Sequence, residues 1–254
     1  MSKFGEIVKR ELTGWKPWHI IWMVVANLVI IGVSIYMRDP AESTLDTVLN
    51  IVAAVTGVIC VILCGLGKVS NYLFGTINVV LYVFIAFKAK YYGDVMLNGL
   101  YYFPTNIIGW ILWEKNVGKG ENTVAKKRMK WWQDVIWGVV SVGAVFAYSF
   151  LLKLLGGNLP LVDSMSTVFS IVAQILMMLR FTEQWIIWII VDVVSVIMWA
   201  VAYSKGEGSI AMLLMWSVYL GNAIIMFIKW MKESHSNKIA EEKIAEEKSA
   251  VDTE

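Results

Sequence analysis

The sequence is poor in charged residues and in the side chains that most catalytic and metal sites require. Asp, Glu, Lys and Arg make up 17% of the 254 residues, and there are 2 histidines and 2 cysteines. Soluble domains carry about 25% charged residues, so we do not expect a soluble globular enzyme. No Walker motif, Gly-x-Ser-x-Gly elbow or His-based metal motif occurs. The net charge of +2, without a basic stripe, also argues against nucleic acid as a partner. We therefore predict no enzyme activity, no cofactor and no metal site.

Hydrophobic residues, in contrast, are abundant and make up 58% of the chain. They form eight apolar runs, each close to the roughly 20 residues with which a helix crosses a bilayer. The runs are Trp18–Met37, Leu45–Leu66, Val69–Ala89, Tyr92–Trp113, Trp131–Leu155, Leu161–Leu179, Trp185–Tyr203 and Ser209–Met231. The first run is too long for the apolar core of a signal peptide, and we expect it to stay in the protein. The pattern predicts an all-α integral membrane protein with eight transmembrane helices.

The basic residues predict the orientation of these helices. Of the 22 Lys and Arg residues, 17 lie on the side that holds both ends of the chain, and five lie on the other side. Because cytoplasmic loops are enriched in Lys and Arg, we expect both termini to be cytoplasmic. The loop after the fourth run, with Lys126, Lys127, Arg128 and Lys130, carries the largest share of this bias.

Two sets of three runs resemble each other. Asp46 and Asp163 each stand at the start of a set, and residues 71–80 match residues 185–194 at a shift of 114. Since a single run separates the sets, both begin on the same side of the membrane. Parallel repeats of this kind build some transporters, with the substrate site near the midplane between the repeats.

This 3+1+3 organisation divides the chain into five parts. They are an N-terminal cytoplasmic segment with an extra helix (1–44), a first three-helix bundle (45–113), a basic cytoplasmic loop with a linker helix (114–160), a second three-helix bundle (161–231) and a charged cytoplasmic tail (232–254).

Polar side chains inside the apolar runs indicate where a substrate binds, because such groups are costly in a membrane unless they face a cavity or a partner. Asp192 is the one ionisable residue well inside a run, since Asp94 and the other charged residues lie at run ends. Amides and aromatic rings share its helix face or lie on neighbouring runs. The predicted substrate-binding residues are Asn71, Phe74, Asn78, Tyr82, Tyr102, Asn106, Gln174, Trp185, Trp188, Asp192, Tyr219 and Asn222.

These residues predict a site for a flat, hydroxylated molecule that carries a positive charge or none. Indole faces attract cations, and amides bind hydroxyl or carboxamide groups in both directions. Packing offers an alternative for Asp192, which would then bond a neighbouring helix. Trp15, Trp18, Trp131, Trp132 and Trp230 are predicted to be anchors at the membrane interface rather than ligands.

Two other features concern packing and motion. Pro104 interrupts the fourth run and predicts a kink, which is either a hinge or static. Cys60 and Cys64 lie on one helix face without a partner that would complete a metal site, and we interpret them as small packing residues.

Several longer motifs resemble a known family. They are the stretch Lys68–Val79, the triplet Ile108-Gly109-Trp110, the pair Asp163-Ser164 with the following Ser170–Ala173, and the segment Gln184–Trp188. Together they resemble the bacterial PnuC family of nicotinamide riboside transporters, over roughly residues 45–231. Two departures from the family are the first run, which precedes the shared core, and Asp192, which stands where an Asn is expected. An ionised Asp192 would balance a pyridinium charge, whereas a protonated one would act as the amide does.

The resemblance implies a SWEET-like fold and a homotrimer in the bacterial inner membrane. It also implies facilitated diffusion of nicotinamide riboside into the cytoplasm, drawn by a riboside kinase that phosphorylates it there, with the lipid bilayer as the other partner. The residues alone leave open a different vitamin or a sugar as substrate, and a receptor that binds without transport.

Overall fold

The computed structural model describes residues 3–38, 40, 42–88, 92–118, 121–154, 160–206 and 208–251, and these residues contain helices and no β-strand. The elements are α1 (Lys3–Leu12), α2 (Pro17–Tyr36), α3 (Thr44–Leu66), α4 (Asn71–Lys88), α5 (Tyr92–Met96), the π-helix η1 (Leu97–Tyr102), α6 (Phe103–Glu114), α7 (Trp131–Leu154), α8 (Pro160–Met178), α9 (Gln184–Ser204) and α10 (Ile210–Val251).

Each predicted apolar run is helical over most of its described residues. Six of the described helices are long and apolar enough to cross a membrane, namely α2, α3, α4, α7, α9 and the part of α10 that spans Ile210–His235. The shorter apolar helix Ser164–Met178 belongs to α8. The remaining run forms one helical path from α5 through η1 to α6. The predicted all-helical membrane architecture is therefore confirmed. The predicted count of eight crossings stays a prediction.

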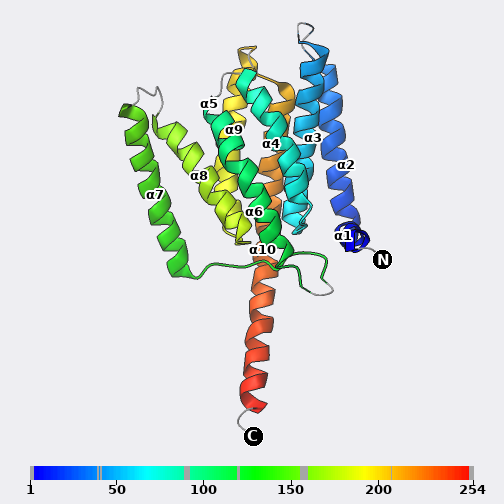
Figure 1. Cartoon of the computed structure of the whole chain (residues 1–254), viewed down its shortest axis with the longest axis vertical. Helices are drawn as coiled ribbons and strands as arrows, with labels where there is room; N and C mark the ends of the chain where they lie inside the picture. Colours follow the sequence, from blue (N-terminus) through cyan, green and yellow to red (C-terminus); the bar gives the residue numbers. More distant parts are fainter. Residues whose placement is uncertain are drawn as a thin grey trace.

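The helices form two neighbouring groups. The first group is α3, α4 and the α5–η1–α6 path, which contact one another through α4, and the second is α8, α9 and α10, in which α9 contacts both others. The groups meet where α10 packs on α3 and where α6 packs on α8. Among the described elements, α2 contacts α3 and α10, whereas α7 contacts α8 alone. In Figure 1 both termini and the α6–α7 loop lie toward the lower end of the molecule.

Two matching turns end the first helix of each group. Gly67 has a φ of 76° and donates its N–H to the carbonyl of Cys64, and Arg180 has a φ of 66° and donates its N–H to the carbonyl of Met177. A residue with a left-handed backbone conformation just after the last helical turn is typical of the Schellman motif, which ends many helices. The two turns are 113 positions apart, one fewer than the shift of 114 that the middle helices indicate.

The side chains that follow these turns also correspond. Asn71 donates its amide N–H to the carbonyl of Lys68 at 2.6 Å, and Gln184 donates to the carbonyl of Phe181 at 3.0 Å. Each amide therefore satisfies a carbonyl three residues earlier, at the start of α4 and of α9. In this turn Gln184, rather than Trp185, is the counterpart of Asn71.

Pro104 lies just inside α6, directly after η1. The N–H of Phe103 bonds to the carbonyl of Asn98, five residues earlier, which is the wider spacing of a π-turn. The π-turns let the helical path continue through a residue that has no N–H to donate. The predicted interruption is therefore a change of helix type, and a hinge at Pro104 stays a prediction.

Candidate functional site

A cavity of about 170 Å³ lies between the two groups of helices, and we call it the central cavity. Residues from α3, α4, the α5–η1–α6 path, α8, α9 and α10 line it, and none of its lining residues comes from α2 or α7. Nine of the twelve predicted substrate-binding residues are in its lining. They are Asn78, Tyr82, Tyr102, Asn106, Gln174, Trp185, Trp188, Asp192 and Tyr219.

Helix α9 supplies one wall of the central cavity. Trp185, Trp188, Asp192 and Ser195 lie along one helix face, and all four line the cavity. The Asp192 side chain is buried, as are Trp185 and Ser195. The polar stripe read from the sequence therefore faces the interior of the molecule rather than lipid.

An amide pair joins the two groups at this site. Gln174 on α8 donates its amide N–H to the Asn106 carbonyl oxygen on α6 at 3.2 Å, and its Nε2 lies 3.5 Å from the Thr105 hydroxyl. All three side chains are buried. On α4, Asn78 donates to the carbonyl of Ala53 on α3 at 2.7 Å, which fixes the amide at the cavity wall. Such amides present both donors and acceptors to a polar ligand.

Aromatic rings from both groups lie close together in the lining of the central cavity. The rings of Tyr102 on η1 and Trp188 on α9 lie 6.5 Å apart at 39°. Two ring faces at this spacing, with the Asp192 carboxyl group on the same wall, suit a flat ring that carries positive charge.

A cluster of four aromatic residues lies at the lower end of the central cavity, and we call it the aromatic closure. Tyr72 packs edge-on against Trp113 with ring centroids 5.3 Å apart, and Trp185 packs in the same manner against Trp230 at 5.7 Å. Trp113 and Trp230 meet each other at 6.5 Å. Each group of helices thus contributes one edge-on pair, and the two pairs join at Trp113 and Trp230.

Two indole hydrogen bonds cross between the groups in the aromatic closure. Trp113 on α6 donates to the carbonyl of Met177 on α8 at 3.0 Å, and Trp230 on α10 donates to the carbonyl of Gly65 on α3 at 2.8 Å. Trp230 is fully buried. The predicted role of Trp230 as an interface anchor is therefore wrong, whereas Trp131, Trp132 and Trp18 are exposed as that role requires.

Three predicted substrate-binding residues are not in the cavity lining. Asn71 caps the turn before α4, as described above, and Asn222 donates to the carbonyl of Val61 on α3 at 3.0 Å. Both amides are buried and donate to backbone carbonyls, which accounts for their N–H groups without a ligand, whereas their Oδ1 atoms are buried with no hydrogen-bond partner among the described residues. Phe74 is half-buried. The substrate contacts of these three residues stay predictions that the geometry does not support.

The cavity also contains residues that the predicted set lacks. Asp94 on α5 lines it, together with Ser166 and Ser170 on α8 and both cysteines of α3. Asp94 accepts a hydrogen bond from the Tyr82 hydroxyl, with an O–O distance of 3.4 Å. Asp94 was not predicted as a site residue because it lies at the end of an apolar run, where a charged residue is common in membrane proteins. The two serines could not be singled out from the sequence, because serine is small and common in helices.

A second, wider cavity of about 890 Å³ opens at the end of the molecule opposite the aromatic closure, and we call it the outer cavity. It is lined by the ends of α2, α4 and α9 and the beginnings of α3 and α10. Trp199 lines the outer cavity, and its ring lies 6.5 Å from that of Tyr82, edge-on at 71°. Since Tyr82 lines the central cavity, these two rings lie between the two cavities.

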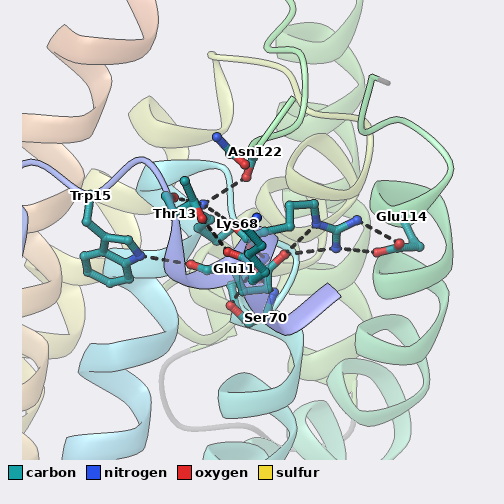
Figure 2. A network of polar contacts seen from close by, with 10 residues as sticks. Glu11, Thr13, Trp15, Lys68, Ser70, Glu114 and Asn122 are labelled. Atoms are coloured by element: carbon teal, nitrogen blue, oxygen red, sulfur yellow. Dashed lines mark hydrogen bonds and ion pairs between the residues drawn. The ribbon is translucent and has the colours of Figure 1, made fainter. Parts of the chain in front are cut away.

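A polar network ties α1 to the lower end of the first group (Figure 2). Arg10 makes two bonds of 2.8 Å to the Glu114 carboxylate, and these hydrogen bonds raise the pKa of Arg10 above its ordinary value. Glu11 accepts from the N–H and hydroxyl of Ser70. Lys68 donates to three backbone carbonyls, including that of Arg10, and burial lowers the pKa of its ammonium group. The network holds α1 across the turn between α3 and α4.

No group of three or more His, Cys, Asp or Glu side chains in the described part of the chain is placed to hold a metal ion. The described lining of the central cavity offers amides, hydroxyls, aromatic faces and carboxyl groups.

Comparisons with known proteins give the family. The family model described as "Nicotinamide mononucleotide transporter" matches residues 47–232. A Neisseria mucosa protein named nicotinamide riboside transporter PnuC is 40% identical over 232 residues, which are 88% of this chain and 85% of that protein. A Haemophilus influenzae protein of the same name is 31% identical over 236 residues, covering 91% and 97%.

A solved structure agrees with the sequence comparisons. It is described as the crystal structure of the vitamin B3 transporter PnuC, and it matches this fold with a TM-score of 0.80 at 38% identity, covering 91% of this chain and 98% of the other. The resemblance drawn from the motifs is confirmed: the chain belongs to the PnuC family of membrane transporters.

Proposed function

We propose that this protein carries nicotinamide riboside into the bacterial cytoplasm. The observation that carries the proposal is the central cavity, to which both groups of helices contribute amides, aromatic faces and carboxyl groups. Nicotinamide riboside offers a flat pyridinium ring, a carboxamide and ribose hydroxyls. Trp188 and Tyr102 suit the ring, while Gln174 and Asn106 suit the carboxamide or the hydroxyls.

The cavity favours the riboside over the mononucleotide that the family model's description names. Among its described lining residues there is no Lys or Arg, whereas two carboxyl groups, Asp94 and Asp192, are present. A phosphate group is normally met by Lys, Arg or a cluster of backbone N–H groups. The relatives named for the riboside agree with this choice.

The proposed mechanism is alternating access by uniport. In it all eight predicted segments cross the membrane as 3+1+3 with an extra first helix, and the two groups rock around the central cavity. The aromatic closure keeps the cavity shut toward the end that holds both termini, which the basic residues make cytoplasmic. Phosphorylation of the riboside inside the cell then keeps the flow inward. The inner membrane and a homotrimer belong to the same proposal.

Flux into liposomes tests this function. Purified protein in liposomes should take up labelled nicotinamide riboside until the inside and outside concentrations are equal, without an ion gradient. Unlabelled riboside should compete, whereas nicotinamide mononucleotide, thiamine and glucose should not. A folded, detergent-stable protein that gives no riboside flux would overturn the proposal. Riboside binding without flux would point instead to a receptor.

A further inference from the structure

Residues 121–130 of the α6–α7 loop lie across the lower end of the molecule (Figure 1), and we call them the strap. The strap bonds to both of the matching turns that end α3 and α8. The N–H of Val124 donates to the carbonyl of Gly67 at 3.0 Å, and the N–H of Lys127 donates to the carbonyl of Arg180 at 2.9 Å. The strap therefore joins the two groups of helices at these turns.

The two contact points of the strap are close together in the chain. Val124 and Lys127 are three positions apart, and three residues of extended chain reach at most about 11 Å. While both bonds hold, Gly67 and Arg180 cannot move far apart. For the two groups to separate at this end of the molecule, the strap has to leave one of them.

The strap also packs against the aromatic closure. Val124 is buried and belongs to the same core cluster as Trp113 and Trp230. The Lys126 ammonium group lies 5.7 Å from the centre of the Trp230 ring, a distance at which an indole face attracts a cation, and it pairs with the Glu233 carboxylate on α10. Separation of the two groups at the aromatic closure therefore disturbs the strap as well.

The strap is bonded extensively to the second group. Thr182 donates both its N–H and its hydroxyl to the carbonyl of Lys127, each at 2.9 Å. The Arg180 guanidinium group donates to the carbonyl of Ala125 at 3.3 Å. Release on this side would break these bonds together with the one from Lys127 to Arg180, around two buried side chains, and would therefore be costly.

The bonds of the strap to the first group cost less to break. In addition to the backbone bond at the α3 turn, Lys68 donates to the carbonyl of Asn122 at 3.0 Å (Figure 2). The same ammonium group donates to the carbonyls of Arg10 and Thr13 at 2.8 and 2.6 Å. Lys68 keeps these two bonds when Asn122 leaves, so its charge is not left without a partner.

We propose that the strap is a latch on the cytoplasmic side of the carrier. It parts from the α3 turn when this side opens, and it stays on the α8 turn throughout the cycle. The proposal rests on the function and the alternating access proposed above. Release of the strap, together with opening of the aromatic closure, then limits how often the central cavity opens to the cytoplasm.

Disulfides that lock either side of the strap test this latch. Val117, three residues after α6, forms an isolated antiparallel bridge with Val124. Lys127 forms a parallel bridge with Phe181 in the α8 turn. Neighbouring extended chains lie about 4.8 Å apart, which suits a disulfide. The variants are Val117→Cys/Val124→Cys, which locks the strap to the first group, and Lys127→Cys/Phe181→Cys, which locks it to the second.

Each variant is compared with its own reduced form in liposomes, with Cys60 and Cys64 replaced by Ser throughout. Both reduced variants should take up riboside at the rate of this background. Oxidation of the 117–124 pair should lower uptake to about a tenth or less, reversibly, whereas oxidation of the 127–181 pair should leave it within about twofold. Unchanged uptake with the 117–124 pair oxidised would overturn the inference, as would a block of uptake by the 127–181 disulfide.

Labelling gives a second measurement that needs no disulfide. Val124 and Met129 are both buried, Val124 beside the aromatic closure and Met129 in a core cluster with residues of α8. In inside-out vesicles, a membrane-impermeant maleimide should label Val124→Cys several-fold faster than Met129→Cys, because opening exposes the first position alone. Equal rates would contradict the latch. Failure of the proposed function is distinct, because the protein with an unlocked strap would then show no riboside flux.

Discussion

At the scale of single residues, Trp188 is the side chain whose loss should weaken binding most clearly. Its ring lies 6.5 Å from that of Tyr102 in the cavity lining, so Trp188→Ala removes both an apolar face and a cation–π partner. We expect the Kd for nicotinamide riboside to rise by about tenfold or more. Titration calorimetry on purified protein measures it.

The control for Trp188 is an indole with no place in the cavity. Trp132 is exposed at the start of α7, and Trp132→Ala should leave the Kd unchanged. A Trp188→Ala protein with wild-type thermal stability and wild-type affinity would remove Trp188 from the binding site.

Residues also show why the site was only partly predictable. A polar side chain in an apolar run is a strong signal of an interior position, and nine of the twelve predicted residues do line one cavity. The same signal cannot separate a ligand contact from a bond to a backbone carbonyl, which is what Asn71 and Asn222 make. Asp94 was not predicted to line the cavity, because its helix is short and its position in the sequence is that of an ordinary charged loop residue.

At the scale of helices, a single glycine governs how closely three elements meet at the cavity. Gly57 on α3 faces Tyr219 of α10 and Asn78 of α4, and a Cβ at this position would lie 2.7 Å from the Asn78 amide nitrogen and would also collide with the Tyr219 hydroxyl. Gly57→Ala therefore forces both side chains away from the cavity wall. Overpacking of this kind costs about 1–3 kcal/mol.

We expect Gly57→Ala to lower the thermal stability and to impair riboside uptake more than the stability loss alone explains. Gly138 on α7 has nothing within 4 Å of an added Cβ, so Gly138→Ala is the matched control. Uptake and melting temperature, measured on both variants, check the prediction. Normal uptake by Gly57→Ala would mean that Tyr219 and Asn78 are not needed where they stand.

Helix positions were predicted well because apolar runs of membrane length have few alternatives to helix. All eight runs are helical over most of their described residues, and the turns at Gly67 and Arg180 resemble each other, while the 3+1+3 repeat stays a prediction. The ends of helices were harder to interpret. A Trp there suits both the membrane interface and a closure between helices, and only tertiary packing distinguished Trp230 from Trp131.

At the scale of the whole molecule, α1 fastens the lower end of the first group through the pair of Arg10 and Glu114 (Figure 2). Both charges are partly exposed, so we expect Glu114→Gln to cost no more than about 1 kcal/mol of stability. The loss should shrink in 1 M salt, because salt screens such pairs. Melting curves of the variant and of Glu121→Gln, an exposed control, measure it. A loss that does not depend on salt would contradict an ionic role.

The aromatic closure is the point at which the whole molecule has to open toward the cytoplasm in the proposed mechanism. Its two indole hydrogen bonds, from Trp113 to Met177 and from Trp230 to Gly65, both join one group of helices to the other. Replacing both indoles, as Trp113→Phe/Trp230→Phe, keeps aromatic packing and removes both donors. Each buried bond contributes about 1 kcal/mol, so the closed state should lose ~2 kcal/mol, roughly thirtyfold in the open-to-closed ratio.

Cys64 reports this change, because it is buried, lines the central cavity and packs in the same core cluster as Trp113 and Trp230. In inside-out vesicles, a membrane-impermeant maleimide should label Cys64 at least tenfold faster in the double variant than in the wild type, and saturating riboside should slow the labelling. Cys60, which also lines the cavity, is replaced by Ser in both proteins so that one thiol is counted. Trp131→Phe/Trp132→Phe, at the exposed start of α7, should label at the wild-type rate. Unchanged labelling of Cys64 in the closure variant would show that these bonds do not hold the cytoplasmic side shut.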